Sequence, residues 1–118
     1  NCLVAVEING VPGIMVVDTG ATLAGVDEQF ALQMKAKSRI AHALTIDAAG
    51  IERATKLTTL SSFRIGGVNV RAPDLRIGSY GFYDATHGKI VGLLGMDILG
   101  HNGTIIDFGQ RKLYFYPL

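Results

Sequence analysis

Short apolar runs that end at glycine-containing turns recur along the chain, and this alternation of strand-like runs and turns most constrains its fold. The first two runs flank Asn9-Gly10, the dipeptide most typical of a two-residue β-hairpin turn. Later runs flank Ala48-Ala49-Gly50 and Gly66-Gly67, and the last two flank Gly109-Gln110. Seven or more short strands at this spacing, about the number in small all-β domains, predict a barrel or a sandwich.

Helical signals are few. Asp27 is a candidate N-cap for a short helix, because apolar residues follow it at helical spacing. A helical turn is also expected directly after Gly95. Residues 78–88, which are rich in glycine, polar and aromatic residues, are expected to form a loop.

Composition excludes several classes of protein. The chain is 48% hydrophobic and 18% charged, which is too apolar for a disordered tail. The net charge is +1 and the basic residues are scattered, so no nucleic acid or anionic lipid is expected as a partner. No apolar run reaches the roughly 18 residues that a transmembrane helix needs, so no membrane segment is predicted within this chain.

The length of 118 residues predicts a single domain over 1–118. Because Asn1 opens directly on strand-like sequence, we expect this domain to be excised from a longer precursor. The lone Cys2 leaves the redox compartment open. A periplasmic or membrane-anchored location, through flanking residues, is one alternative for a compartment that the sequence does not determine.

Two apolar runs end in motifs that carry chemistry. Residues 16–22 read VVDTGAT, so a strand runs into Asp18 and then into a turn of small residues. A carboxylate at the end of an apolar run is costly unless hydrogen bonds or a second titratable group compensate. About seventy positions later, Leu93-Leu94-Gly95 ends another apolar run and Met96-Asp97-Ile98-Leu99 follows.

This pair of motifs resembles the retropepsin-like aspartic proteases, the family of the retroviral proteases and related cellular domains. The likeness extends over nearly the whole chain: hairpin, Asp-Thr-Gly, flap hairpin, strands, apolar-apolar-Gly, short helix, terminal strand. The resemblance implies an all-β, retropepsin-like half of a closed β-barrel with one short helix, active as a two-fold dimer. It implies no cofactor and no metal.

The family's chemistry explains why one Asp-Thr-Gly requires a partner. Aspartic proteases hold a water between two carboxyl groups that share one proton. One carboxylate takes a proton from the water while the other, protonated, polarises the scissile carbonyl. Asp18 is the only aspartate followed by Thr-Gly or Ser-Gly, so the resemblance implies a homodimer in which each chain contributes Asp18 as the catalytic residue. The reaction is hydrolysis of a peptide bond.

The resemblance also assigns the neighbours of Asp18. Thr19 would donate a hydrogen bond across the dimer axis, Gly20 would let backbone N–H groups approach the carboxylates, and Thr22 would complete the active-site loop. Ala21 stands where pepsin-like enzymes carry a hydroxyl, and we therefore expect activity at mildly acidic to near-neutral pH. The residues expected to pack beneath this loop are Leu93, Leu94 and Gly95.

The hairpin around Ala48, Ala49, Gly50 and Ile51 matches the family's flap, which closes over substrate and excludes water. A flap pairs with an extended peptide by strand addition, so the expected substrate is unstructured polypeptide. This hairpin departs from familiar members because its tip has one glycine and it carries no aromatic residue.

Further departures affect the dimer. Met96 and Asp97 replace the Arg-Asn pair of the retroviral enzymes, so the contacts made there by arginine must be built differently. The terminal segments 1–8 and 111–118 are expected to supply the rest of the interface. Asp97, at the start of a helical turn, is expected to be a helix cap.

Two other functions stay open. The chain could be a non-catalytic retropepsin-fold module that binds peptide or dimerises, or a fragment whose activity needs flanking sequence. His42, His87 and His101 are scattered without a paired ligand motif, so they predict no metal site. The stretch SYGFYD is expected at the surface, with a substrate-facing role as the alternative. Cleavage preference, physiological substrate and dimer affinity are left open.

Overall fold

The computed structural model describes residues 2–34, 38–46, 52–71, 74–100, 105–107, 110 and 112–114. This part of the chain holds eleven strands and three short helices. The strands are β1 (Cys2–Ile8), β2 (Val11–Val17), β3 (Gly25–Asp27), β4 (Ser38–Ile46), β5 (Glu52–Thr58), β6 (Phe63–Ile65), β7 (Val68–Asn69), β8 (Leu75–Gly78), β9 (Ile90–Leu94), β10 (Ile105–Asp107) and β11 (Lys112–Tyr114). The helices are α1 (Glu28–Gln33), α2 (Phe82–Ala85) and α3 (Met96–Leu99).

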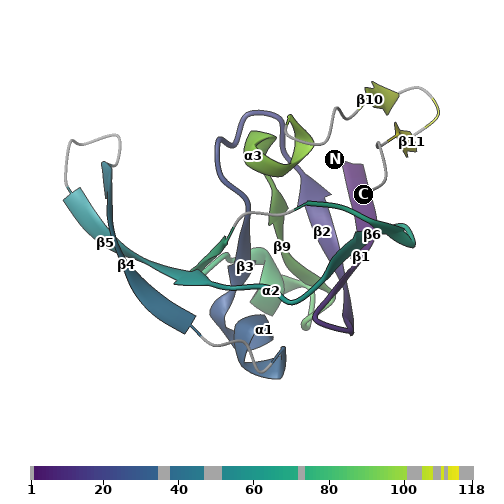
Figure 1. The fold of residues 1–118 in the computed structure, drawn as a ribbon. Helices are drawn as coiled ribbons and strands as arrows, with labels where there is room; N and C mark the ends of the chain where they lie inside the picture. Colours follow the sequence, from purple (N-terminus) through teal and green to yellow (C-terminus); the bar gives the residue numbers. More distant parts are fainter. Residues whose placement is uncertain are drawn as a thin grey trace.

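Nine strands form one curved sheet in the order β4-β5-β8-β3-β9-β2-β1-β6-β7, and β10 pairs with β11 separately. In Figure 1 the β4–β5 hairpin extends from one side of the body, and β10–β11 lies beside the start of β1 on the other. The expected all-β fold is therefore confirmed for the described part of the chain.

The predicted first hairpin is confirmed. Ile8 pairs with Val11 and Cys2 with Val17, so β1 and β2 are antiparallel in unbroken register. The turn residues Asn9 and Gly10 have φ of 52° and 82°, the left-handed values that a type I′ turn requires at both positions. This turn chemistry is why the Asn-Gly dipeptide predicts the hairpin correctly.

The central strands bring the two sequence motifs together. β2 runs parallel to β9, with Val17 beside Leu94, although the two residues are far apart in the sequence. β3 lies on the other side of β9 and is parallel to β8. Because β2 and β9 end at the same edge, the segments that follow them, the Asp-Thr-Gly loop and α3, meet there.

The helix expected after Asp27 is also confirmed. The Asp27 side chain accepts a hydrogen bond from the Gln29 N–H at 3.0 Å, which satisfies one donor of the first turn of α1. Phe30 and Ala31 are buried, so the apolar face of α1 packs against the sheet.

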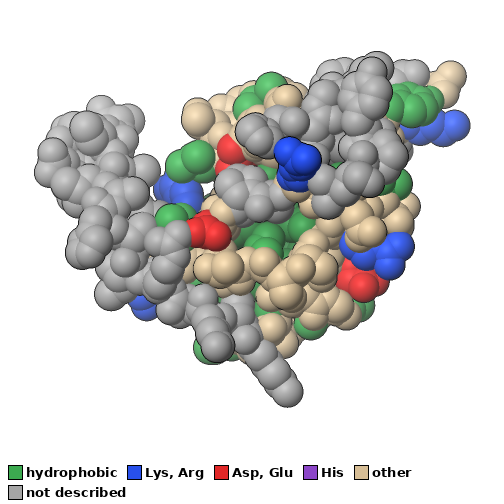
Figure 2. Space-filling model, viewed as in Figure 1, with side chains coloured by type: hydrophobic (Ala, Val, Ile, Leu, Met, Phe, Trp, Pro, Cys, Tyr) green, Lys and Arg blue, Asp and Glu red, His purple; other side chains and the backbone are tan. Residues whose placement is uncertain are grey.

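The core lies between the inner face of the sheet and the helices. Its fully buried members come from strands and helices distant in sequence and include Ile8, Met15, Val26, Leu94 and Ile98. On the face shown in Figure 2, acidic and basic side chains of the described residues are scattered among hydrophobic and neutral ones.

The prediction of a single loop over residues 78–88 needs correction, because α2 lies within it. Tyr83 is 7% exposed and packs in the core, which holds this turn against the body. The turn ends where His87 and Gly88 take φ of 54° and 81°. A helix of four residues is too short for an apolar period to be visible in the sequence. The described residues thus contain three short helices, where the sequence predicted a helix after Asp27 and a helical turn after Gly95.

The β4–β5 and β6–β7 hairpins agree with the predicted strands, and Gly66 and Gly67 form the turn between β6 and β7 with φ of 56° and 82°. The final hairpin is present as β10 and β11, with Ile105 opposite Tyr114. Among the described helices, none combines the length and apolarity required to cross a membrane.

Candidate active site

Asp18 lies directly after β2 and is exposed in the single chain. Its N–H donates to the Leu94 carbonyl at 3.0 Å, which continues the β2–β9 ladder by one residue. Its carbonyl accepts from the Ala21 N–H at 3.1 Å, closing a tight turn. The backbone on both sides of the carboxylate is therefore fixed by hydrogen bonds.

The Asp18 carboxylate contacts its own loop through Gly20. The Gly20 N–H donates to Oδ1 at 3.0 Å. A Cβ added at Gly20 would lie 3.3 Å from that same oxygen, tighter than ordinary contact. Glycine therefore allows the N–H to approach the carboxylate, as the resemblance to the retropepsin-like proteases implied for Gly20.

The loop is joined to α3 by three hydrogen bonds. The Met96 N–H donates to the Ala21 carbonyl at 2.8 Å, and the Asp97 N–H donates to the Thr22 carbonyl at 3.1 Å. In the opposite direction, the Ala24 N–H donates to Asp97 Oδ1 at 2.9 Å. Side chain and backbone of α3 thus hold the loop at its middle and at its end.

Asp97 therefore does not act as the helix cap that was expected. The N-cap of α3 is Gly95, and Asp97 lies inside the helix. Its Oδ1 also accepts from the Ile98 N–H at 2.9 Å, while the bond to Ala24 reaches across to the loop before β3. The Asp97 carboxylate thus fastens the loop that carries Asp18 in its own chain.

Gly95 lies against the loop backbone. A Cβ at this position would be 2.7 Å from the Leu23 carbonyl carbon and 2.9 Å from the Ala24 nitrogen, distances that real Cβ atoms essentially never show. The backbone could not pass so close if the residue carried a side chain. The structure thus places Gly95 directly under the loop.

The two leucines before Gly95 point in different directions. Leu94 is fully buried in the core below the loop, and its carbonyl accepts the Asp18 N–H. Leu93 is half-buried and pairs with Val16 and Gly25, so it lies on the opposite face of the sheet. Only Leu94 and Gly95 among the three predicted support residues therefore lie beneath the loop.

The remaining loop residues lie around the carboxylate. Thr19 and Thr22 are exposed and Ala21 is half-buried in the single chain. Leu23 and Met96 are also exposed, at 40% and 44%, so an apolar surface borders the site. Among the described residues no hydrogen bond of the Thr19 hydroxyl is present, and its predicted bond across a dimer axis stays a prediction.

The hairpin predicted to be the flap is present as β4 and β5 (Figure 1). Its register shifts between Ala41 and Leu44, which marks a bulge. The predicted tip residues Ala48, Ala49, Gly50 and Ile51 lie outside the described residues.

The contact between Asp27 and Tyr80 was not predicted from the sequence. Asp27 is 5% exposed, and its Oδ2 accepts from the Tyr80 N–H at 3.2 Å. Burial raises the pKa of the Tyr80 hydroxyl above its usual 10.0; the nearby Arg76 charge opposes this shift and the Asp27 charge adds to it. The Tyr80 ring stacks on Phe82 with centroids 5.7 Å apart. The Gly-Ser-Tyr-Gly spacing alone carries no signal of this contact.

No group of three or more His, Cys, Asp or Glu side chains that could hold a metal occurs in the part of the chain that the structure describes. His87 is in the turn after α2, and His101 lies outside the described residues.

Residues 4–101 match a family model described as "gag-polyprotein putative aspartyl protease". The match spans most of the chain, and the protein therefore belongs to this family of retroviral-type aspartyl proteases. Among solved structures, it is similar to the retroviral protease-like domain of Ddi1 from Leishmania major, with a TM-score of 0.66 and 16% identity. That similarity covers 99% of this chain and 89% of the other, and it supports the retropepsin-like fold. Comparison with curated protein sequences found no match.

Proposed function

We propose that the protein is an aspartic endopeptidase in which two copies of the chain each contribute Asp18 to one active centre. The observation that carries the proposal is an exposed Asp18 carboxylate on a loop held by the β9–α3 segment. Because the Asp18 carboxylate is fixed in position and exposed, the Asp18 carboxylate of a second chain could lie beside it. Membership of the aspartyl protease family supports the same chemistry.

The proposed reaction adds water across a peptide bond. The ionised member of the Asp18 pair takes a proton from a water as its oxygen bonds to the scissile carbonyl carbon. The protonated member donates its proton to the carbonyl oxygen. The tetrahedral intermediate then collapses, the C–N bond breaks, and the leaving nitrogen takes up a proton. Two carboxyl groups share one proton in this cycle because like charges about 3 Å apart cannot both ionise.

The substrate class follows from the β4–β5 hairpin. Acting as a flap, this hairpin would offer backbone groups to a strand laid along it, so the substrate is an extended, unfolded polypeptide. The proposed flap residues Ala48, Ala49, Gly50 and Ile51 would cover that strand and exclude water.

The test is cleavage of an unfolded protein such as casein by the wild type and by Asp18→Asn. We expect Asp18→Asn to remove cleavage while keeping the fold, because asparagine keeps the shape but cannot exchange the proton. Asp84→Asn is the matched control, since Asp84 is exposed on α2 outside the loop. Peptide binding by a folded wild type that never cuts would instead support the non-catalytic module.

A further inference from the structure

One row of residues crosses the sheet from the β4–β5 hairpin to β2, the strand directly before Asp18. Residues paired in register lie on the same face of a sheet. The pairings place one residue of each of five neighbouring strands in this row: Leu57 on β5, Arg76 on β8, Gly25 on β3, Leu93 on β9 and Val16 on β2. This set is called the cross-sheet row below.

The cross-sheet row lies on the face opposite the core. Leu75, next to Arg76, is fully buried in the core, and Val26, next to Gly25, is also fully buried. Neighbouring residues of a strand point to opposite faces. Arg76 and Leu93 are accordingly only half-buried. The row therefore lies on the outward face of the sheet and runs from the β4–β5 hairpin to the strand directly before Asp18.

Tyr80 covers the middle of the row. A Cβ added at Gly25 would overlap the Tyr80 hydroxyl and lie 2.8 Å from its Cζ. Gly25 thus leaves the space that the phenol occupies. The ring is fixed by the Tyr80 N–H bond to Asp27 and by stacking on Phe82. The row accordingly offers an aromatic surface directly beside the side chain of Arg76.

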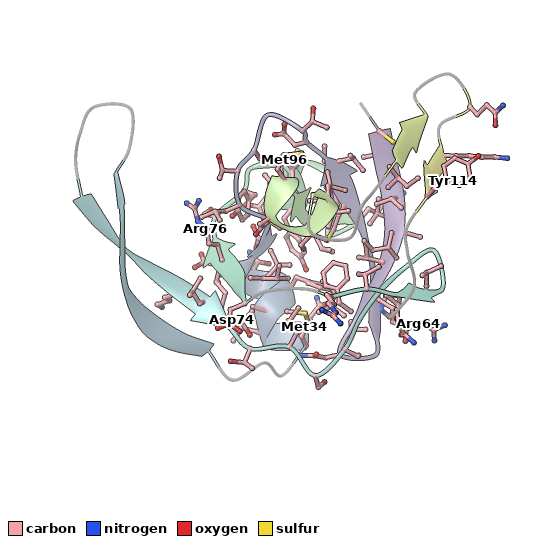
Figure 3. All side chains as sticks on the ribbon, turned by 45° about the horizontal axis from the view of Figure 1, so that its top comes forward. Met34, Arg64, Asp74, Arg76, Met96 and Tyr114 are labelled. Carbon is pink, nitrogen blue, oxygen red and sulfur yellow. The ribbon has the colours of Figure 1, made fainter. Side chains whose placement is uncertain are left out.

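Arg76 places a positive charge beside this aromatic surface, since burial raises the pKa of the Tyr80 hydroxyl and the Arg76 charge opposes this larger effect. The buried Asp27 carboxylate accepts the N–H groups of Gln29 and Tyr80. In Figure 3 Arg76 lies on the side of the body toward the β4–β5 hairpin, and Arg64 lies on the opposite side.

From this juxtaposition we propose that Arg76 is a specificity-determining residue that selects an acidic side chain near the scissile bond. A half-buried guanidinium beside an aromatic surface favours a carboxylate, which it can bind through two parallel hydrogen bonds. The preferred substrates are thus extended polypeptides carrying Asp or Glu. This inference rests on the proposed function, since it names the substrate class of the same site.

The expected position of the acidic residue follows from strand geometry. Three strand steps of about 4.8 Å separate Arg76 from Val16, so the two backbones are roughly 14 Å apart. The arginine side chain and the substrate carboxylate together span much of that distance. Since an extended peptide advances about 3.4 Å per residue, the acidic residue lies within about three positions of the cut bond.

The test uses matched short peptides in which one position carries Glu, Gln or Lys, with the full chain as enzyme. For the wild type we expect kcat/KM to be about fivefold higher for Glu than for Gln at one position, the scale of a partly exposed ion pair. Arg76→Gln should bring this ratio to about one, Arg76→Glu should favour Lys, and Arg76→Lys should keep a preference for Glu. Arg64→Gln is the control and should keep the wild-type ratio, because Arg64 donates to the Gly67 carbonyl on the far side of the body.

A second arm separates this inference from the proposed function. The same peptides are bound to Asp18→Asn, with and without Arg76→Gln, and followed by fluorescence anisotropy. A Glu preference in binding that Arg76→Gln removes supports the role of Arg76, even if no wild-type cleavage occurs and the endopeptidase proposal fails. Cleavage without a Glu preference, or a preference that survives in Arg76→Gln, overturns the role of Arg76 and leaves the endopeptidase proposal standing. Absence of any Glu preference in both arms also overturns it.

Discussion

The Asp97 carboxylate and the Ala24 N–H, 73 residues apart in the sequence, are joined by a hydrogen bond of 2.9 Å. The bond ties the end of the active-site loop to α3. It lies next to two backbone bonds from the same helix, so the loop has three connections to one turn of chain. The position of Asp18 therefore depends on residues of the second sequence motif, which contains α3.

Removing the Asp97 carboxylate should loosen the active-site loop. Asp97→Ala leaves the partly buried Ala24 N–H without its acceptor, and we expect a loss of about 1–3 kcal/mol of unfolding free energy. Asp97→Asn keeps an acceptor oxygen and should lose less. Urea denaturation of both variants measures the difference. Equal stability of Asp97→Ala and the wild type would contradict this role.

Gly95→Ala should be strongly destabilising. The added methyl would lie 2.7 Å from the Leu23 carbonyl carbon, and a backbone atom cannot swing aside as a flexible side chain can. We expect a loss of about 2 kcal/mol or more in unfolding free energy. The control is Gly81→Ala, where nothing lies within 4 Å and φ is −54°, so the change should stay within about 0.5 kcal/mol. Thermal unfolding of the two variants compares them directly.

Mixing experiments should reveal whether two Asp18 residues act together. Wild type and Asp18→Asn, mixed in equal amounts and allowed to exchange subunits, should retain about a quarter of the wild-type activity if only the pure wild-type dimer cuts. Independent monomers would retain about half. Specific activity should also fall on dilution. The shared site would be ruled out if the activity of the mixture were proportional to its content of wild type and the specific activity did not fall on dilution.

Tyr80 should make stability depend on alkaline pH. Because its pKa is raised above 10.0 in the folded state, chiefly by burial, the unfolded chain loses this proton first. The stabilisation that the protonated Tyr80 hydroxyl gives to the folded state is fully present below about pH 10. It is lost as the pH rises through the folded-state pKa. Tyr80→Phe removes the titrating group, so the decline in unfolding free energy above pH 10 should be shallower. Denaturation of both proteins on each side of pH 10 measures it, and identical slopes would refute this assignment.

Thr58 and Thr86 should respond in opposite ways to substitution by valine. Thr58 is fully buried, and its hydroxyl has no hydrogen-bond partner among the described residues. Thr58→Val removes a desolvated polar group at nearly constant shape and should be neutral or stabilising by about 1 kcal/mol. Thr86→Val is the matched comparison, because the Thr86 hydroxyl accepts from the Ile90 N–H at 3.0 Å and donates to the Phe82 carbonyl. Thr86→Val should lower the unfolding free energy by about 1–3 kcal/mol, which chemical denaturation measures.

Local chemistry explains which elements were predictable from the sequence. Asn9-Gly10 predicts a hairpin because few other residues accept left-handed φ at two successive positions. Asp27 predicts a helix start because its short side chain reaches the N–H of Gln29. Asp18 was noticeable because a carboxylate at the end of an apolar run needs hydrogen bonds or a second titratable group to offset its burial. Gly95 was noticeable because the end of an apolar run there carries no side chain.

Other features were decided only when distant segments met. The Asp97 bond to Ala24, the position of Tyr80 over Gly25 and the turn of α2 depend on sheet register and core packing between residues far apart in the sequence. A hydrogen bond across 73 residues leaves no periodicity or local pattern to find. The amino-acid sequence thus determined the strands, the turns and the residue that follows β2. The tertiary structure decided what holds that residue and what lies beside it, because those contacts join groups that only folding brings within reach.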